Sequence, residues 1–210
     1  MQGPDMAQAA AASRLISGAH YAVIVSPDRP SADSISSDLA LKLSFETMHK
    51  TVLWIGTGER AQSFDFIAGN DSLQSPKAVD SLRDKIDMVV FAAADTINAY
   101  QGVLDERPWL RAQKPTLWFD NHRLPDNFRP TGSLVNPMAC ATAEVLLDIC
   151  LSWRWEITPD IAKLLMLGVV AGTENFTNNQ TDEPARTAAD RLTQRGADRT
   201  ASAKLLGYSG

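Results

Sequence analysis

Acidic and imidazole side chains follow three apolar segments of the chain. Asp28 and Asp33 come after the first segment, Asp95 after the third, and Asp120 and His122 after the fourth. Taken one at a time, such acids are most often helix caps or turn residues exposed to water. Brought together, their like charges would repel one another unless a divalent cation neutralised them. The pattern therefore leaves two interpretations open, a metal-binding site or a set of separate caps.

The segments before these residues have the composition of buried β-strands. Short runs rich in β-branched and aromatic residues, without polar alternation, are typical of strands covered on both faces. We expect strands at 21–25, 51–55, 87–94, 116–119 and 133–135. Parallel strands of this kind bring the residues beyond their carboxyl ends to one edge. The sequence therefore predicts an α/β fold, doubly wound, with a mainly parallel sheet and helices on both faces.

Helical patterns separate and follow these strands. We expect helices at 6–17, from Asp33 or Ser34 through Leu43, after Thr96 through Leu104, and at 142–153, 158–168 and 182–196. Thr158 and Asp182 are the expected N-caps of the last two, because a proline follows each in the first turn. Residues 57–80 are mixed and polar and give no clear pattern.

Length and composition are those of a globular protein: 210 residues, 44% hydrophobic and 21% charged. The net charge of -5 argues against a strongly cationic nucleic-acid scaffold, although a local basic groove is compatible with it. Cys140 and Cys150 lie in an apolar stretch and are interpreted as reduced core thiols. No membrane span or signal peptide is recognisable, so we expect a cytoplasmic protein with no membrane partner.

Four motifs, in order along the chain, resemble those of the DHH phosphoesterase family, which includes RecJ-like and bacterial oligoribonuclease-like enzymes. Residues 27–41 read PDRPSADSISSDLAL and are similar to the family's HxNPDGDAIGSSLAL. Asp95-Thr96 resembles the second motif, and Asp120-Asn121-His122 resembles the D-H-H signature. Residues 168–176 read GVVAGTENF and are similar to GIxxDTGxF. Each motif alone is weak, but their order makes the resemblance specific, and it implies a DHH-type fold.

The resemblance also implies a reaction and a set of site residues. The family uses two metal ions, typically manganese, to activate a water and hold a phosphate. Matching positions assign metal binding to Asp33 and Asp95, and to Asp28 if the first motif carries a three-residue insertion. They place Asp120 and His122 in the catalytic signature, near the substrate phosphate. A histidine held by Asp120 for structural reasons alone is the alternative interpretation of His122.

Other metal-ligand positions of the family have changed in this chain. An ungapped match puts Pro27 and Ser31 at the first histidine and first aspartate, Asn121 at a signature histidine, and Gly172 at the fourth-motif aspartate. With the insertion, the histidine position holds Ser26 instead. Proline and glycine side chains donate nothing to a metal, and neutral Ser and Asn bind manganese weakly. The sequence therefore predicts a degenerate two-metal site without the family's hydrolysis.

The expected domain organisation also bears on whether the chain is catalytic. Residues 1–210 are expected to form a single DHH-like domain without the C-terminal substrate-binding domain of the family, either because the sequence is a piece of a longer protein or because the protein lacks this half of the cleft. Because the family's active site lies between the two domains, this absence also argues against catalysis.

Three functions follow from these observations, in order of preference. The first is a non-catalytic domain that binds a nucleotide, a short single-stranded oligonucleotide or a protein partner, including a second copy of itself in a homodimer. The second is a manganese-dependent phosphoesterase with a rearranged site, and the third is an unrelated doubly wound binding protein. Trp54 and Trp118 are expected in the core, whereas Trp109 is either a packed anchor or a base-stacking side chain.

Overall fold

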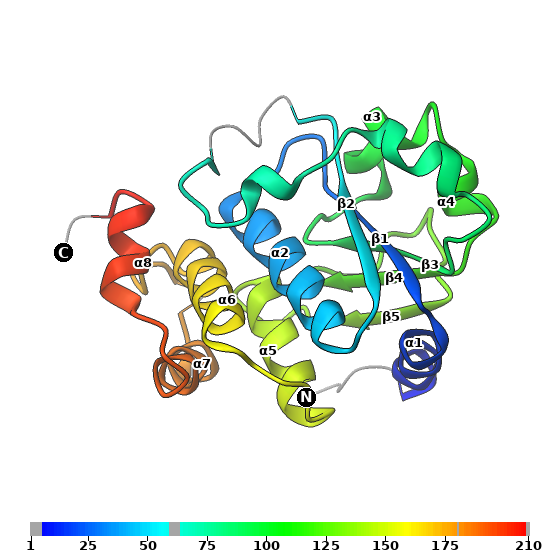
Figure 1. Ribbon diagram of the computed structural model, residues 1–210. Coiled ribbons are helices and arrows are strands. Elements are labelled where there is room, and N and C mark those ends of the chain that lie inside the picture. Colours follow the sequence, from blue (N-terminus) through cyan, green and yellow to red (C-terminus); the bar gives the residue numbers. More distant parts are fainter. Residues whose placement is uncertain (1–5, 59–63, 180, 209–210) are drawn as a thin grey trace.

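The computed structural model describes residues 6–58, 64–179 and 181–208, which form a five-stranded sheet with helices on both faces (Figure 1). The strands are β1 (Tyr21–Val25), β2 (Thr51–Ile55), β3 (Met88–Ala92), β4 (Thr116–Asp120) and β5 (Gly132–Val135). All neighbouring pairs are parallel, in the order β2-β1-β3-β4-β5. The predicted parallel, doubly wound α/β fold is confirmed.

Both faces of the sheet are buried, which explains the absence of polar alternation in the strands. In β1, Ala22 and Ile24 contribute to one hydrophobic core, and Val23 and Val25 contribute to the other. This division follows from the geometry of a strand, in which successive side chains point to opposite faces. Trp54 and Trp118 are fully buried, one in each core, as predicted.

Different helices cover the two faces. The larger core is covered by α1 (Met6–Gly18), α2 (Ala32–Thr47), α5 (Thr142–Ser152) and α6 (Pro159–Gly172), with α7 (Glu183–Thr193) and α8 (Arg199–Leu205) packed on α6. The smaller core is covered by the short elements η3 (Pro76–Leu82), η4 (Ile97–Tyr100), α3 (Gln101–Leu104) and α4 (Trp109–Ala112). Figure 1 shows α3 and α4 on the opposite side of the sheet from α2, α5 and α6.

Several boundaries differ from those predicted. The third strand ends at Ala92 rather than at residue 94, because Ala93 adopts a left-handed conformation with φ of 58°. The helix predicted to end at Gly168 continues to Gly172. The unassigned stretch 57–80 includes the 3-10 turn η2 (Asn70–Ser72) and the start of η3, while 59–63 lie outside the described residues.

The N-cap of α2 is Ser31, rather than Asp33 or Ser34. The Ser31 hydroxyl accepts a hydrogen bond of 3.1 Å from the Ser34 backbone N–H, and the Ser34 hydroxyl accepts one of 2.6 Å from the Ser31 N–H. This reciprocal pair satisfies two donors at the start of the helix. The side chain of Asp33 is thereby left for another role. The caps predicted at Thr158 and Asp182 are confirmed.

Candidate functional site

The clearest cleft at the carboxyl edge of the sheet lies where the strand order reverses. The chain leaves β1 toward α2 on one face and leaves β3 toward η4 and α3 on the other. Doubly wound folds bind ligands at this topological switch point. A cleft of about 500 Å³ is found here, lined by Pro27, Asp28, Arg29, Ser31, Ala93, Ala94, Asp95, Asn98, Ala99 and His122. The structure thus brings three of the predicted site residues, Asp28, Asp95 and His122, to one cleft.

Asp28 connects the loop after β1 to the start of α3 through hydrogen bonds. Its backbone N–H donates to the Ala99 carbonyl at 2.7 Å, and its Oδ2 accepts from the Gly102 N–H at 2.8 Å. The contact requires glycine at position 102, since a Cβ there would lie 2.6 Å from Asp28 Oδ1. One oxygen of Asp28 is therefore already bonded to the protein.

Asp120 and His122 form a hydrogen-bonded pair at the end of β4. Asp120 is fully buried, and its Oδ1 lies 2.9 Å from His122 Nδ1 and 3.2 Å from the His122 N–H donor. The hydrogen bond and the negative charge of Asp120 raise the pKa of His122. A proton on Nδ1 is thereby favoured, and Nε2 of the half-exposed imidazole, which forms no hydrogen bond with the described residues, can meet a ligand in the cleft.

Asp33, which the motif resemblance assigns to metal binding, forms hydrogen bonds within the protein. Its Oδ2 accepts from the Thr142 N–H at 2.9 Å, and its Oδ1 accepts from the Ala143 N–H at 3.1 Å and from the Ser37 hydroxyl at 3.2 Å. Desolvation by burial raises the pKa of Asp33 to about 6, although these donors oppose the shift. Asp33 is not among the residues that line the cleft. Its carboxylate instead binds the N-terminus of α5, whose free N–H groups favour an anion.

Close packing fills the position where the resemblance would place the fourth-motif aspartate. A Cβ on Gly172 would lie 2.5 Å from the Cys140 carbonyl oxygen and 2.8 Å from the Ala141 Cβ. One turn earlier, a Cβ on Gly168 would lie 2.5 Å from the Ala143 Cβ and 2.6 Å from Asp33 Oδ1. These glycines let α6 lie directly against the start of α5 and the side chain of Asp33.

Solved structures show what this fold is similar to. An exopolyphosphatase-related protein from Bacteroides fragilis superposes with a TM-score of 0.84 at 18% identity, over 98% of this chain and 62% of the other. A candidate family II inorganic pyrophosphatase from Methanococcus jannaschii gives 0.59 at 15% identity, over 89% of this chain and 60% of the other. An exonuclease RecJ bound to manganese gives 0.50 at 12% identity, over 90% of this chain and 47% of the other.

The chain has the DHH phosphoesterase fold. It spans about three fifths of the length of the first two solved structures. Neither a family model nor a curated protein sequence matches it. The fold predicted from the four motifs is therefore confirmed by structure.

The acids that the DHH resemblance assigns to a manganese pair have separate surroundings in this structure. Within the described parts of the chain, no group of three or more His, Cys, Asp or Glu side chains is placed to hold a metal ion. The predicted acids are instead divided among separate partners. Asp28 is bonded to α3, Asp33 to α5, and Asp120 to His122, while Asp95 is exposed at the cleft.

Sequence reasoning missed Asp38, a fully buried acid of α2 in this DHH domain. Its Oδ2 accepts a hydrogen bond of 3.0 Å from the Trp54 indole N–H. Burial raises the pKa of Asp38 well above its usual range despite this bond. The available signal was helical spacing, because Asp38 lies three residues after Ile35, which is also buried.

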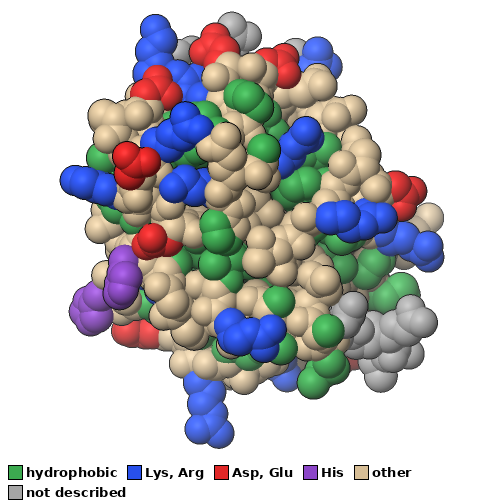
Figure 2. Space-filling model, turned by 90° about the vertical axis from the view of Figure 1, so that its right-hand side faces the viewer, with side chains coloured by type: hydrophobic (Ala, Val, Ile, Leu, Met, Phe, Trp, Pro, Cys, Tyr) green, Lys and Arg blue, Asp and Glu red, His purple; other side chains and the backbone are tan. Residues whose placement is uncertain are grey.

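The exposed face around α4 gives no support for a stacking role of Trp109. The Trp109 side chain is only 9% exposed, and the Arg83 guanidinium lies 5.1 Å from the centre of its ring. Lys and Arg side chains on this face are interspersed with Asp and Glu rather than gathered in a continuous stripe (Figure 2). The interpretation of Trp109 as a packed anchor is therefore the one that the structure favours.

None of the helices in the described segments is both long enough and apolar enough to span a membrane.

Proposed function

We propose that this DHH-fold chain binds the phosphate of a nucleotide or short single-stranded oligonucleotide in the switch-point cleft and does not hydrolyse it. One observation carries the proposal: the Asp33 carboxylate is bonded to two backbone N–H groups of α5 and to Ser37. An acid engaged in this way has no free oxygen directed to a metal ion. Without a metal pair, a water in the cleft keeps its high pKa and the phosphate charge is not neutralised for attack.

The chemistry of the cleft supports a ligand with both anionic and hydroxyl groups. Arg29 and the protonated form of His122 are cationic donors suited to a phosphate. Asp28 and Asp95 are acceptors suited to sugar hydroxyls and unfavourable for a second anion. A nucleotide satisfies both requirements, whereas inorganic phosphate satisfies only the first.

Calorimetric titration in EDTA tests this proposal directly. AMP and the dinucleotide pApA are expected to bind the wild-type chain without any metal. Loss of one charge-assisted hydrogen bond in His122→Ala is expected to weaken binding about tenfold. His49→Ala, which changes an exposed histidine that is absent from the cleft, is the matched control and is expected to bind normally. Binding that requires manganese, or that is unchanged in His122→Ala, would contradict the proposal.

A manganese-dependent phosphoesterase is the second candidate, because Asp28, Asp95 and His122 line one cleft. To hold an ion these side chains would have to move closer together, because among the described residues no group of three is placed to bind a metal. The two candidates differ in turnover: robust hydrolysis of pApA on addition of manganese would favour the enzyme. A protein partner or a homodimer, like a cytoplasmic location, remains a prediction from the sequence.

A further inference from the structure

A second cavity lies at the opposite edge of the sheet from the switch-point cleft. It has a volume of about 410 Å³ and is lined by Ser13, Ile16, Ser17, Met48, Lys50, Trp153 and Trp155. Lys50 directly precedes β2, and the next residue, Thr51, donates its backbone N–H to the His20 carbonyl just before β1. The cavity is thus at the amino ends of these strands, and its volume is within the range of small-molecule sites.

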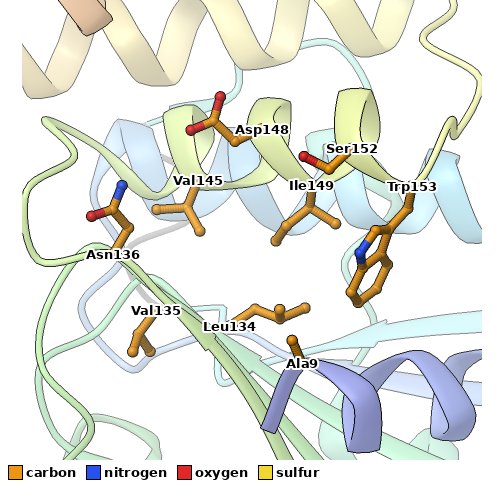
Figure 3. Close-up of a pocket in the computed structure, with 9 residues that line it drawn as sticks. All are labelled: Ala9, Leu134, Val135, Asn136, Val145, Asp148, Ile149, Ser152 and Trp153. Atoms are coloured by element: carbon orange, nitrogen blue, oxygen red, sulfur yellow. The ribbon is translucent and has the colours of Figure 1, made fainter. Parts of the chain in front are cut away.

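Two indole rings form the aromatic wall of this cavity. The centres of Trp153 and Trp155 are 5.6 Å apart with an interplanar angle of 67°, and Trp155 makes an edge contact with the buried Phe45. Trp153 also lines a neighbouring cavity of about 240 Å³ between α1 and α5. Figure 3 shows its indole extending from the end of α5 toward α1, near Ala9. The Trp153 side chain therefore borders both cavities.

Lys50 provides a cation that forms no ion pair with the residues that the structure describes. Its Nζ donates to the Ala19 carbonyl at 2.6 Å, and no carboxylate of the described residues lies within ion-pair distance of it. The nearby Asp87 instead accepts from the backbone N–H groups of His20 and Tyr21. Burial lowers the pKa of Lys50, whereas the charge of Asp87 raises it. A bound anion would neutralise this ammonium group.

Two hydroxyl groups complete the polar side of the cavity. Ser13 and Ser17 are four residues apart on α1, so they lie on one face of the helix. Neither hydroxyl forms a hydrogen bond with another residue in the part of the chain that the structure describes. Each can donate to an oxygen of a ligand.

We propose that this cavity binds a planar aromatic carboxylate, with its ring against Trp153 and Trp155 and its carboxylate on Lys50 and the α1 serines. The three parts of the lining correspond to three parts of such a molecule. The ring gains contact with indole surface, the carboxylate charge gains the Lys50 ammonium group, and the remaining oxygen lone pairs gain hydroxyl donors. The site does not depend on the function of the switch-point cleft.

The test is a titration of the ¹⁵N-labelled full chain, followed through its tryptophan indole N–H signals. Indole-3-carboxylate is the probe, and indole-3-carboxamide is the uncharged analogue of the same shape. The carboxylate is expected to shift the signals of Trp153 and Trp155 in a saturable way and those of Trp54, Trp109 and Trp118 little. The carboxamide is expected to bind about tenfold more weakly, a difference of about 1.4 kcal/mol.

Variants separate the charge of Lys50 from its packing. Lys50→Met is expected to lose the preference for the carboxylate, and Lys50→Arg to keep it. Lys163→Met, which removes an exposed lysine of α6 outside the cavity, is the control and is expected to bind like the wild type. If Lys50→Met does not fold, the affinities of the two probes for the wild-type chain still show whether the cavity prefers a carboxylate. Equal affinity for the two probes, or no shift of Trp153 and Trp155, would overturn the proposal.

Discussion

The Oδ2 atom of Asp33 accepts a 2.9 Å hydrogen bond from the backbone N–H of Thr142, the first residue of α5 and 109 positions later in the chain. The second oxygen accepts from Ala143 and Ser37. Free N–H groups and the helix dipole make an N-terminus favourable to an anion. In this chain they offset only part of the cost of burial, because the pKa of Asp33 is still raised to about 6.

Replacing Asp33 by Asn should therefore reduce stability rather than metal affinity. An amide group keeps one oxygen acceptor, but its NH₂ group would face a backbone N–H of α5. An unmet buried donor of this kind costs about 1–3 kcal/mol. Urea unfolding monitored by circular dichroism measures the loss. Asp190→Asn, at an exposed site of α7, is the control and should stay within about 0.5 kcal/mol of the wild type. Equal stability of the two variants would show that the Asp33 contacts contribute little.

Restoring the aspartate at position 172 should not restore a metal site. The Cβ of Gly172→Asp would lie 2.5 Å from the Cys140 carbonyl oxygen, so α5 and α6 would have to separate. Overpacking of this kind costs about 1–3 kcal/mol, and a buried carboxylate adds to it. Gly18→Ala is the control, because nothing lies within 4 Å of the added Cβ. Thermal unfolding gives the comparison, and a Gly172→Asp chain as stable as Gly18→Ala would contradict the packing shown here.

The buried acid Asp38 should make stability fall as pH rises. Its folded-state pKa is raised well above the usual 3.8, so the folded chain retains this proton at pH values where the unfolded chain loses it. The free energy of unfolding then decreases from about pH 4 up to the folded pKa, by at most about 1.4 kcal/mol per pH unit. Asp38→Asn removes this dependence while keeping an acceptor for Trp54. Between pH 4.5 and 8, the free energy of unfolding of Asp38→Asn should increase relative to that of the wild type. A difference between the two chains that does not change with pH would contradict a raised pKa of Asp38.

The Asp120–His122 pair can be examined by proton NMR of the imidazole. The pKa of His122 should be above its ordinary 6.5 in the wild type and lower in Asp120→Asn, because the variant loses both the hydrogen bond and the charge. Stability from this pair is present below the unfolded pKa and is lost as pH rises through the folded one. Asp126→Asn, an exposed change in the following loop, should leave the His122 titration unaltered. An identical His122 titration in all three chains would mean that the pair does not interact in solution.

The sheet was predictable because its signal is local. β-branched and aromatic runs such as 21–25 and 51–55 bury both faces, and a parallel sheet is the usual way to cover such strands. The ends of helices were harder to predict. Gly168 is compatible with a helix end, yet α6 continues past it because the residue serves close helix packing rather than termination. Ser31 was not predicted as the cap because Asp33 and Ser34 are equally suitable by residue type.

The sequence predicts where the candidate site residues lie in the fold, but not which groups their side chains contact. Asp28, Asp95 and His122 line one cleft, as expected of residues that follow parallel strands. The motifs cannot indicate that Asp33 points to α5, because that contact depends on how helices from distant parts of the chain pack. Asp38 was missed for a related reason: an acid within a helix is usually exposed, and its partner Trp54 lies on a strand.

The most direct measurement is anomalous diffraction at the manganese edge, from crystals of the wild-type chain soaked in manganese and AMP. We expect no manganese bonded to Asp33, an unbroken hydrogen bond from Thr142 to Asp33, and at most one weakly occupied ion near Asp95 and His122. Two fully occupied manganese ions, with an Asp33 oxygen among their ligands, would contradict the account.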